Sequence, residues 1–148
     1  MQHSTKVPGG YKERIYVAGP MSKIPQYNVP AFLTAETDLI GKGFDVALPV
    51  DLNIPHEVKK LLSCKTGTEP ATGRIWEELL SEDLKLIGMT GVEGIVVLKG
   101  WQYSRGARLE TFYGRLKNLN IKHYPSLRKV SDRELQVAHG LPLGVENY

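Results

Sequence analysis

The sequence predicts an α/β fold: a three-layer sandwich in which a flavodoxin-like or Rossmann-like parallel sheet of about four to five strands lies between helices. Short apolar runs alternate along the chain with helical stripes, in the order β-α-β-α-β-α-β. One run, Gly94–Leu98, is apolar throughout, as is typical of a parallel strand buried on both faces. A composition of 41% hydrophobic and 24% charged residues over 148 positions suits one globular domain.

The N-terminal end is expected to differ from the rest of the chain. Residues 1–13 are predicted to form a flexible arm with a hinge at Pro8-Gly9-Gly10. Residues 14–148 are predicted to form a single domain, because no internal repeat or linker interrupts them.

The first half of this domain has the pattern of a βαβ unit. Arg14–Ala18 is the first predicted strand, and a loop rich in Gly, Pro, Ser and Asn follows it over residues 19–30. Ala31–Lys42 carries apolar residues at helical spacing, and Phe44–Leu48 is the second predicted strand. Such a unit favours a parallel sheet with a right-handed crossover.

The segment after the second strand is less regular. Pro55–Leu62 has the pattern of a short helix, and Ser63–Gly73 is interpreted as a polar loop or flap. An amphipathic helix is predicted over Arg74–Gly88, with an inward face made of Ile75, Trp76, Leu79, Leu80, Leu84 and Ile87.

The strand Gly94–Leu98 leads into the most informative part of the chain. Ser104 is a good N-cap for a helix predicted over Arg105–Leu116. A last strand is expected at Ile121–Tyr124 and a short helix at Asp132–Ala138. Because parallel α/β sheets bind ligands where strands end and helices begin, the crossing at Ser104 is the first place to look for a site.

Several classes of function are disfavoured. The formal charge of +3 comes from scattered basic residues, which fits a pocket for a small anion and does not suggest binding to polymeric nucleic acid. Neither a dinucleotide fingerprint nor a P-loop is present, so no cofactor is predicted. Cys64 stands alone and the four histidines lack metal-ligand spacing, so no metal site is predicted.

The chain also lacks signals for a membrane. No apolar run approaches the roughly 20 residues that a membrane span needs. The N-terminal stretch lacks the apolar core of a signal peptide. A cytoplasmic protein without a membrane partner is therefore expected.

Glu110 stands out on the predicted helix. Its neighbours on the helix face are Gly106, Ala107 and Gly114, and none of them can pair with a carboxylate. The small residues leave room beside Glu110 for a ligand. The alternative is that they only let the helix pack closely on the sheet, with Glu110 at its rim.

The start of the same helix has the features of an anion site. Ser104, Arg105, Gly106 and Arg108 combine a hydroxyl cap, backbone N–H groups of a first helical turn and two guanidinium groups. Arginine binds phosphate oxygens with two parallel hydrogen bonds. The alternative is an ordinary capped helix with solvated arginines.

Two further features lie near strand ends or helices. Gly19, after the first strand and close to Tyr16, allows a ligand to approach the backbone; the alternative is a plain strand-to-loop turn. Among the acidic residues, Asp83 lies on the helix that precedes the apolar strand, beside Leu84. The remaining acids of that helix, Glu77, Glu78 and Glu82, are interpreted as solvated surface.

The motifs together resemble the nucleoside 2-deoxyribosyltransferase-like superfamily, which includes the 2'-deoxynucleoside 5'-phosphate N-hydrolases. The resemblance covers roughly residues 14–124 and is greatest for a branch of small phage and bacterial members. It rests on Tyr16–Met21 (YVAGPM), Tyr27–Phe32 (YNVPAF), Asp83-Leu84 and Gly100–Glu110 (GWQYSRGARLE). Two departures, Pro20–Lys23 in the first loop and a long segment 52–74, both affect the expected base pocket.

The resemblance implies roles for individual residues. Glu110 matches the nucleophilic glutamate that attacks C1' of deoxyribose, and Asp83 matches the acid that assists departure of the base. Tyr16 and Gly19 match residues of the first loop, while Ser104 and Gly106 match the phosphate-binding turn. Further substrate-binding candidates are Pro20, Met21, Asn28, Asp51, Trp101, Arg105 and Arg108, with core packing as the alternative for Trp101.

The expected function is that of an N-glycosidase acting on a 2'-deoxynucleoside 5'-monophosphate through a glycosyl–Glu110 intermediate. A second carboxyl must protonate the leaving base, and Glu110 and Asp83 (or Asp51) are expected about 5–5.5 Å apart, as in retaining glycosidases. A homodimer or larger homo-oligomer is expected, as in related proteins. The alternatives are a nucleoside deoxyribosyltransferase and a non-catalytic nucleotide-binding module.

Overall fold

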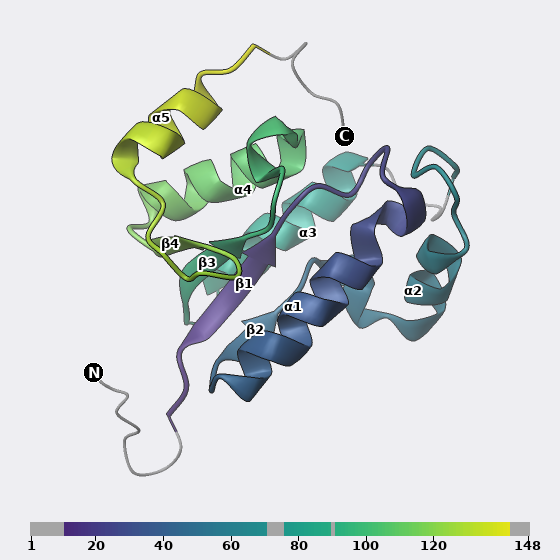
Figure 1. The fold of residues 1–148 in the computed structure, drawn as a ribbon, viewed down its shortest axis with the longest axis horizontal. Helices are drawn as coiled ribbons and strands as arrows, with labels where there is room; N and C mark the ends of the chain where they lie inside the picture. Colours follow the sequence, from purple (N-terminus) through teal and green to yellow (C-terminus); the bar gives the residue numbers. More distant parts are fainter. Residues whose placement is uncertain (1–10, 71–75, 90, 143–148) are drawn as a thin grey trace.

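The computed structural model describes residues 11–70, 76–89 and 91–142. Its four strands form one sheet in the order β2-β1-β3-β4, and all three pairings are parallel (Figure 1). The strands are β1 (Arg14–Ala18), β2 (Asp45–Ala47), β3 (Val92–Val97) and β4 (Asn120–His123). The predicted α/β class and the parallel sheet are therefore confirmed.

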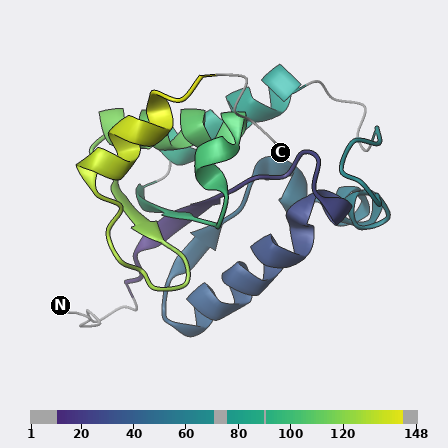
Figure 2. The same ribbon diagram turned by 45° about the horizontal axis from the view of Figure 1, so that its top comes forward.

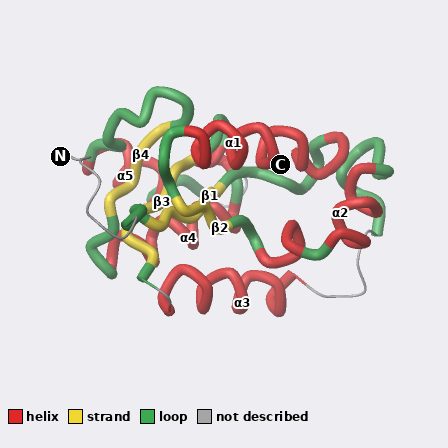
Figure 3. The backbone as a smooth tube through the Cα atoms, turned by 90° about the horizontal axis from the view of Figure 1, so that it is seen from below, coloured by secondary structure: helices red, strands yellow, loops and turns green. Residues whose placement is uncertain are grey.

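Five helices surround this sheet: α1 (Val29–Gly41), α2 (Pro55–Leu62), α3 (Trp76–Met89), α4 (Arg105–Leu116) and α5 (Asp132–His139). Three short 3-10 turns, η1 (Pro25–Asn28), η2 (Val50–Asn53) and η3 (Trp101–Tyr103), connect them to the strands. Figure 2 shows α4 in green and α5 in yellow-green on one side of the strands and α1 in blue on the other. Figure 3 shows α3 on the side of the sheet opposite α1.

The core consists of two apolar clusters because side chains of a strand alternate between its faces. Tyr16 and Ala18 of β1 join residues of α3, α4 and α5 in one cluster. Ile15 and Val17 join residues of α1 and α2 in the other. The sheet is thus covered on both faces, as the apolar run of β3 predicts.

Most predicted elements occur close to their expected bounds. The bounds of β1, α2 and α4 match the prediction, and α1 begins earlier, at Val29. β2 is shorter than predicted because it is an edge strand that pairs with β1 only over Asp45–Ala47. The predicted start of α3 at Arg74 lies outside the described residues.

Residues 1–10 of the predicted N-terminal arm also lie outside the described residues. Residues 11–13 contact the sheet, because the Asp45 N–H donates to the Glu13 carbonyl oxygen over 2.9 Å and the Tyr11 hydroxyl donates to the Glu93 carboxylate. Over the described ranges, no helix combines the length and apolar character needed to cross a bilayer.

Candidate active site

A cavity of about 630 Å³ opens where β1 and β3 end and α4 begins. Its walls are the loop after β1, η2, the loop around residues 68–70, the first turns of α3 and the first turns of α4. The volume lies within the usual range of small-molecule sites, about 300–1,000 Å³. The cavity is therefore at the place that the order of strands and helices predicts.

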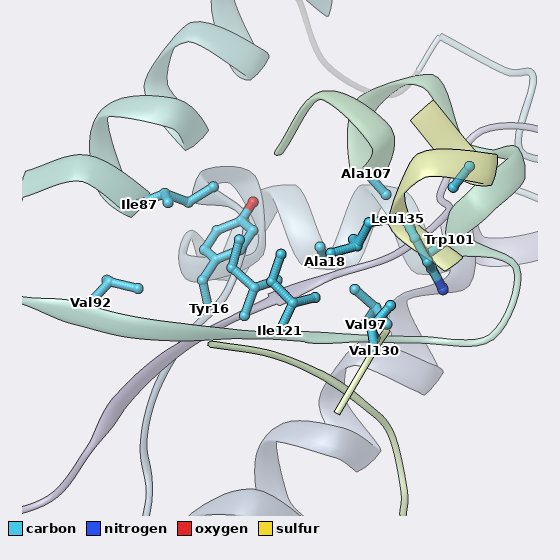
Figure 4. Close-up of a cluster of buried hydrophobic side chains, with 12 residues drawn as sticks. Tyr16, Ala18, Ile87, Val92, Val97, Trp101, Ala107, Ile121, Val130 and Leu135 are labelled. Atoms are coloured by element: carbon cyan, nitrogen blue, oxygen red, sulfur yellow. The ribbon is translucent and has the colours of Figure 1, made fainter. Parts of the chain in front are cut away.

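Glu110 is the acidic residue that α4 contributes to this cavity. Its side chain is buried, with 5% of the residue exposed, yet it contributes to the cavity lining. The Tyr16 hydroxyl donates a hydrogen bond of 2.8 Å to Glu110 Oε2. In Figure 4 the Tyr16 hydroxyl points from the sheet toward the helices.

Two more buried carboxyls lie close to Glu110. Asp83 of α3 shares a hydrogen bond with Glu110, and its Oδ1 accepts a 2.8 Å hydrogen bond from the Val50 N–H. Asp51, on η2, contributes to the cavity lining, whereas Asp83 does not. The spacing of about 5–5.5 Å expected between Glu110 and Asp83 (or Asp51) stays a prediction.

The carboxyls alter one another's proton affinity. Burial raises the pKa of Glu110 well above its usual value, and the neighbouring Asp83 carboxylate raises it further, while the Tyr16 hydrogen bond opposes both. Burial also raises the pKa of Asp83 to about 6, against the lowering effect of the Val50 N–H. Within the described residues, no Lys, Arg or His pairs with Glu110. The Glu110–Asp83 pair therefore retains a proton at pH values where isolated carboxyls are charged.

The first turn of α4 forms another wall of the cavity. The Ser104 Oγ caps the helix by accepting a 3.2 Å hydrogen bond from the Ala107 N–H. The Arg105 guanidinium lies 5.6 Å from the centre of the Trp76 ring. A side chain at Gly106 would meet only Trp76 Nε1, at 3.9 Å, so its absence leaves space in the cavity. The structure thus brings together Ser104, Arg105 and Gly106 as predicted.

Arg108 does not take part in this site. Its side chain is buried against α5, where Nε donates to the Ala138 carbonyl over 3.1 Å and Nη2 donates to the Leu141 carbonyl over 2.6 Å. It lies about 200° around the helix from Glu110 at 100° per residue, which explains why the two face different neighbours. The prediction that Arg108 binds substrate is therefore wrong.

Two small residues predicted to make space for a ligand have packing roles. A side chain at Gly114 would come within 2.5 Å of Ile95 Cδ1, so this glycine lets α4 approach the sheet. A side chain at Gly19 would come within 2.9 Å of Leu98 Cβ, although the Gly19 backbone does contribute to the cavity lining. For Gly114, the packing alternative is correct.

Three other candidates, Trp101, Asn28 and Pro20, are not among the residues that line the cavity. Trp101 is 4% exposed and meets the His139 ring edge-on at 6.4 Å, so it is a core residue. Asn28 donates a 2.9 Å hydrogen bond to the Pro20 carbonyl and thereby fixes the loop after β1. Pro20 is buried, and of the candidates in this loop Gly19 and Met21 reach the cavity.

Several cavity residues have no counterpart in the sequence prediction. Trp76 was expected on the inward face of its helix but is 41% exposed and contributes to the cavity lining, as does the neighbouring Glu77. The signal that could have indicated this placement is an aromatic residue in the first turn of an amphipathic helix, next to a long polar loop. Tyr27 and Lys23 also contribute to the cavity lining.

The wall opposite α4 consists of two loops that are distant in sequence. The Lys23 N–H donates to the Gly67 carbonyl over 2.9 Å, and the Gln26 N–H donates to the Cys64 carbonyl over 2.7 Å. The Tyr27 hydroxyl adds a hydrogen bond to the Glu69 carbonyl. These contacts place residues 68–70 at the cavity. The sequence pattern predicts a loop or flap for this segment but does not predict its position.

In the described part of the chain, no group of three or more His, Cys, Asp or Glu side chains is arranged to hold a metal ion. A comparison with curated proteins and one with solved structures found no match. A family model described as a domain of unknown function (DUF4406) matches residues 13–123. The match includes all strands and the cavity residues of α4, and the chain therefore belongs to the DUF4406 family.

Proposed function

We propose that the protein is an N-glycosidase that hydrolyses a 2'-deoxynucleoside 5'-monophosphate to the free base and deoxyribose 5-phosphate. The observation that carries this proposal is the buried carboxyl of Glu110 at a cavity of nucleotide size, held by a tyrosine hydroxyl and a second carboxyl. The resemblance of residues 14–124 to deoxynucleotide N-hydrolases supports the same chemistry.

Cleavage of an N-glycosidic bond passes through a transition state with positive charge on C1' of the sugar. A carboxylate beside C1' stabilises this charge and can form a covalent bond to it. The Tyr16 hydroxyl fixes Glu110 Oε2 and favours its charged form. Asp83, which shares a hydrogen bond with Glu110, is placed to take the proton of the pair when Glu110 reacts.

The first turn of α4 is the proposed phosphate site. Helix N-termini attract anions because their first N–H groups lack helical partners and the helix dipole is positive there. Arg105 adds a positive charge, and Gly106 leaves the space that a phosphate needs. This assignment favours a monophosphate over an unphosphorylated nucleoside, and thus hydrolysis over deoxyribosyl transfer.

The remaining parts of the proposal concern partners and setting. The substrate is a small deoxynucleotide, the protein acts in the cytoplasm, and it forms a homodimer or a larger homo-oligomer. A non-catalytic nucleotide-binding module is the second candidate, since the cavity would also suit it.

The test is incubation of the protein with each deoxynucleoside monophosphate, followed by chromatography of the released base. The proposal expects base release from at least one monophosphate, no requirement for an acceptor base, and slower release from the matching nucleoside. Release only with an added acceptor base would indicate a transferase. Binding of nucleotides without any release would indicate the non-catalytic module.

A further inference from the structure

We infer that Asp51, and not Asp83, is the acid that protonates the leaving base. This inference rests on the proposed function, because it assigns a role within that same site. It follows from where the two carboxyls lie relative to the cavity: Asp51 contributes to the cavity lining and Asp83 does not.

Asp83 lies behind Glu110. Its Oδ1 accepts the 2.8 Å hydrogen bond from the Val50 N–H, and its carboxyl shares a hydrogen bond with Glu110. With 8% of the residue exposed, it is held by protein groups. A general acid must come within about 2.6–3.2 Å of the atom that it protonates, and a base in the cavity meets Glu110 before it meets Asp83.

Asp51 occupies a different position. It is on η2, which follows β2 and packs against α2 and α3. Asp51 lines the cavity together with Pro49 and Leu61, and it lies close enough to Glu110 and Asp83 to raise the pKa of both. With 6% of the residue exposed, Asp51 is shielded from bulk water although it lines the cavity.

The shape of a nucleotide places the base at this wall. The sugar separates the 5'-phosphate from the base, so a phosphate at the first turn of α4 and C1' at Glu110 direct the base away from α4. Outside α4, the cavity lining includes residues of η2, the end of α2 and residues 68–70. Asp51 is the carboxyl that η2 presents there.

The reaction then balances as follows. A Glu110 carboxylate oxygen bonds to C1', the C1'–N bond breaks with its electron pair going to the base, and the Asp51 carboxyl gives its proton to the base. Water next bonds to C1', its proton passes to the Asp51 carboxylate, and the bond from C1' to Glu110 breaks with its electron pair returning to Glu110. Asp83 acts as a positioning residue that shares a hydrogen bond with Glu110 and takes the proton of the pair when Glu110 reacts.

The experiment compares Asp51→Asn and Asp83→Asn on two substrates: the monophosphate that the wild-type protein cleaves, and a deoxyribose 5-phosphate with p-nitrophenolate at C1'. Nitrophenolate leaves without a proton, so an acid is needed only for the natural base. We expect Asp51→Asn to lose about 10²–10⁴-fold in kcat on the nucleotide and to stay within about tenfold of wild type on the nitrophenyl substrate.

Asp83→Asn is expected to lose activity on both substrates by similar factors and to shift the pH profile of the nitrophenyl reaction, because it changes the proton affinity of Glu110. Cleavage of the nitrophenyl substrate by Asp51→Asn also shows that this variant is folded. Selective sparing of the nitrophenyl substrate by Asp83→Asn, or full nucleotide turnover by Asp51→Asn, would overturn the inference. Wild-type protein that cleaves neither substrate would instead contradict the proposed function itself.

Discussion

Arg108 and Glu110 lie two positions apart on α4. Both are buried, but the groups around them differ in charge and in hydrogen-bonding capacity. The Arg108 guanidinium donates to the carbonyl oxygen of Ala138 in the last turn of α5, where helical carbonyls lack partners within the helix, and to that of Leu141 just after the helix. Glu110 meets a hydroxyl and a second carboxyl. The first arrangement satisfies a buried charge and joins two helices, whereas the second places a buried acid beside another carboxyl, with no countercharge among the described residues.

Under the proposed function, the difference separates a group buried for stability from one buried for chemistry. Burying a carboxyl beside another carboxyl costs folding free energy, and such sites are frequent where function requires a perturbed pKa. Arg108 should therefore stabilise the fold without contributing to turnover. Glu110 should contribute to turnover at a cost in folding stability.

The largest expected effect comes from Glu110→Gln, which keeps the shape of the side chain but removes the nucleophile. We expect base release to fall by about 10³-fold or more. The free energy of unfolding at pH 8 should rise by about 1–2 kcal/mol, because a buried amide replaces a buried acid. Chromatography of the base and chemical denaturation measure the two effects.

The matched control for this change is Glu77→Gln, since Glu77 also contributes to the cavity lining but is exposed. Glu77→Gln should change neither the rate of base release nor the free energy of unfolding as much as Glu110→Gln does. Full turnover by Glu110→Gln would rule out the proposed mechanism.

Arg108→Met should give the next largest effect, on stability alone. It removes the donors of two carbonyls of the α5 end and should lower the free energy of unfolding by about 3 kcal/mol. The KM for nucleotide, measured on the folded fraction at low temperature, should not change. A raised KM with unchanged stability would mean that Arg108 belongs to the substrate site after all.

The pH dependence of stability should reveal the carboxyl pair. The pKa of Asp83 is raised from 3.8 to about 6 on folding, so the folded state binds more protons between these values. The resulting stabilisation is complete below pH 3.8 and is lost as the pH rises through about 6. We expect about 2 kcal/mol of this dependence to disappear in Asp83→Asn. Equal slopes for the variant and wild type, in denaturation at pH 4 to 8, would contradict this assignment.

Arg105→Met should have the smallest effect and the clearest contrast with Arg108→Met. Loss of one guanidinium at the phosphate site should raise the KM for a monophosphate by about tenfold, equivalent to about 1.4 kcal/mol. Stability should change little, because Arg105 is exposed. The matching nucleoside, which lacks the phosphate, serves as the control substrate and should show no such change in KM.

The sequence predicts the fold better than it predicts the site. Alternating apolar runs and helical stripes predict the strands and helices, because periodicity follows directly from which faces are buried. Glu110 could be singled out because its helical neighbours are small. Periodicity does not tell how a helix is rotated about its axis relative to the sheet and its neighbours, however.

That rotation explains the main errors. Arg105 and Arg108 lie in the first turns of one helix and look equivalent in sequence, but one faces the cavity and the other faces α5. Gly114 and Gly106 flank Glu110 alike, but a side chain at Gly114 would strike Ile95. Asp51 and Asp83 are distinguished only by which of them faces the cavity, and this depends on the packing of η2 against α3.

The wall made of residues 23–27 and 64–69 has a consequence for how this family can diversify. Two of its connections, Lys23 to Gly67 and Gln26 to Cys64, join main-chain atoms, and a side chain at Gly67 would come within 2.2 Å of the Ile24 carbonyl. Side chains at Met21, Lys23 and Thr68 can therefore be exchanged without breaking those links. If the proposed function holds, substitutions at these positions change which nucleobase the cavity accepts, while the main chain of the wall stays in place.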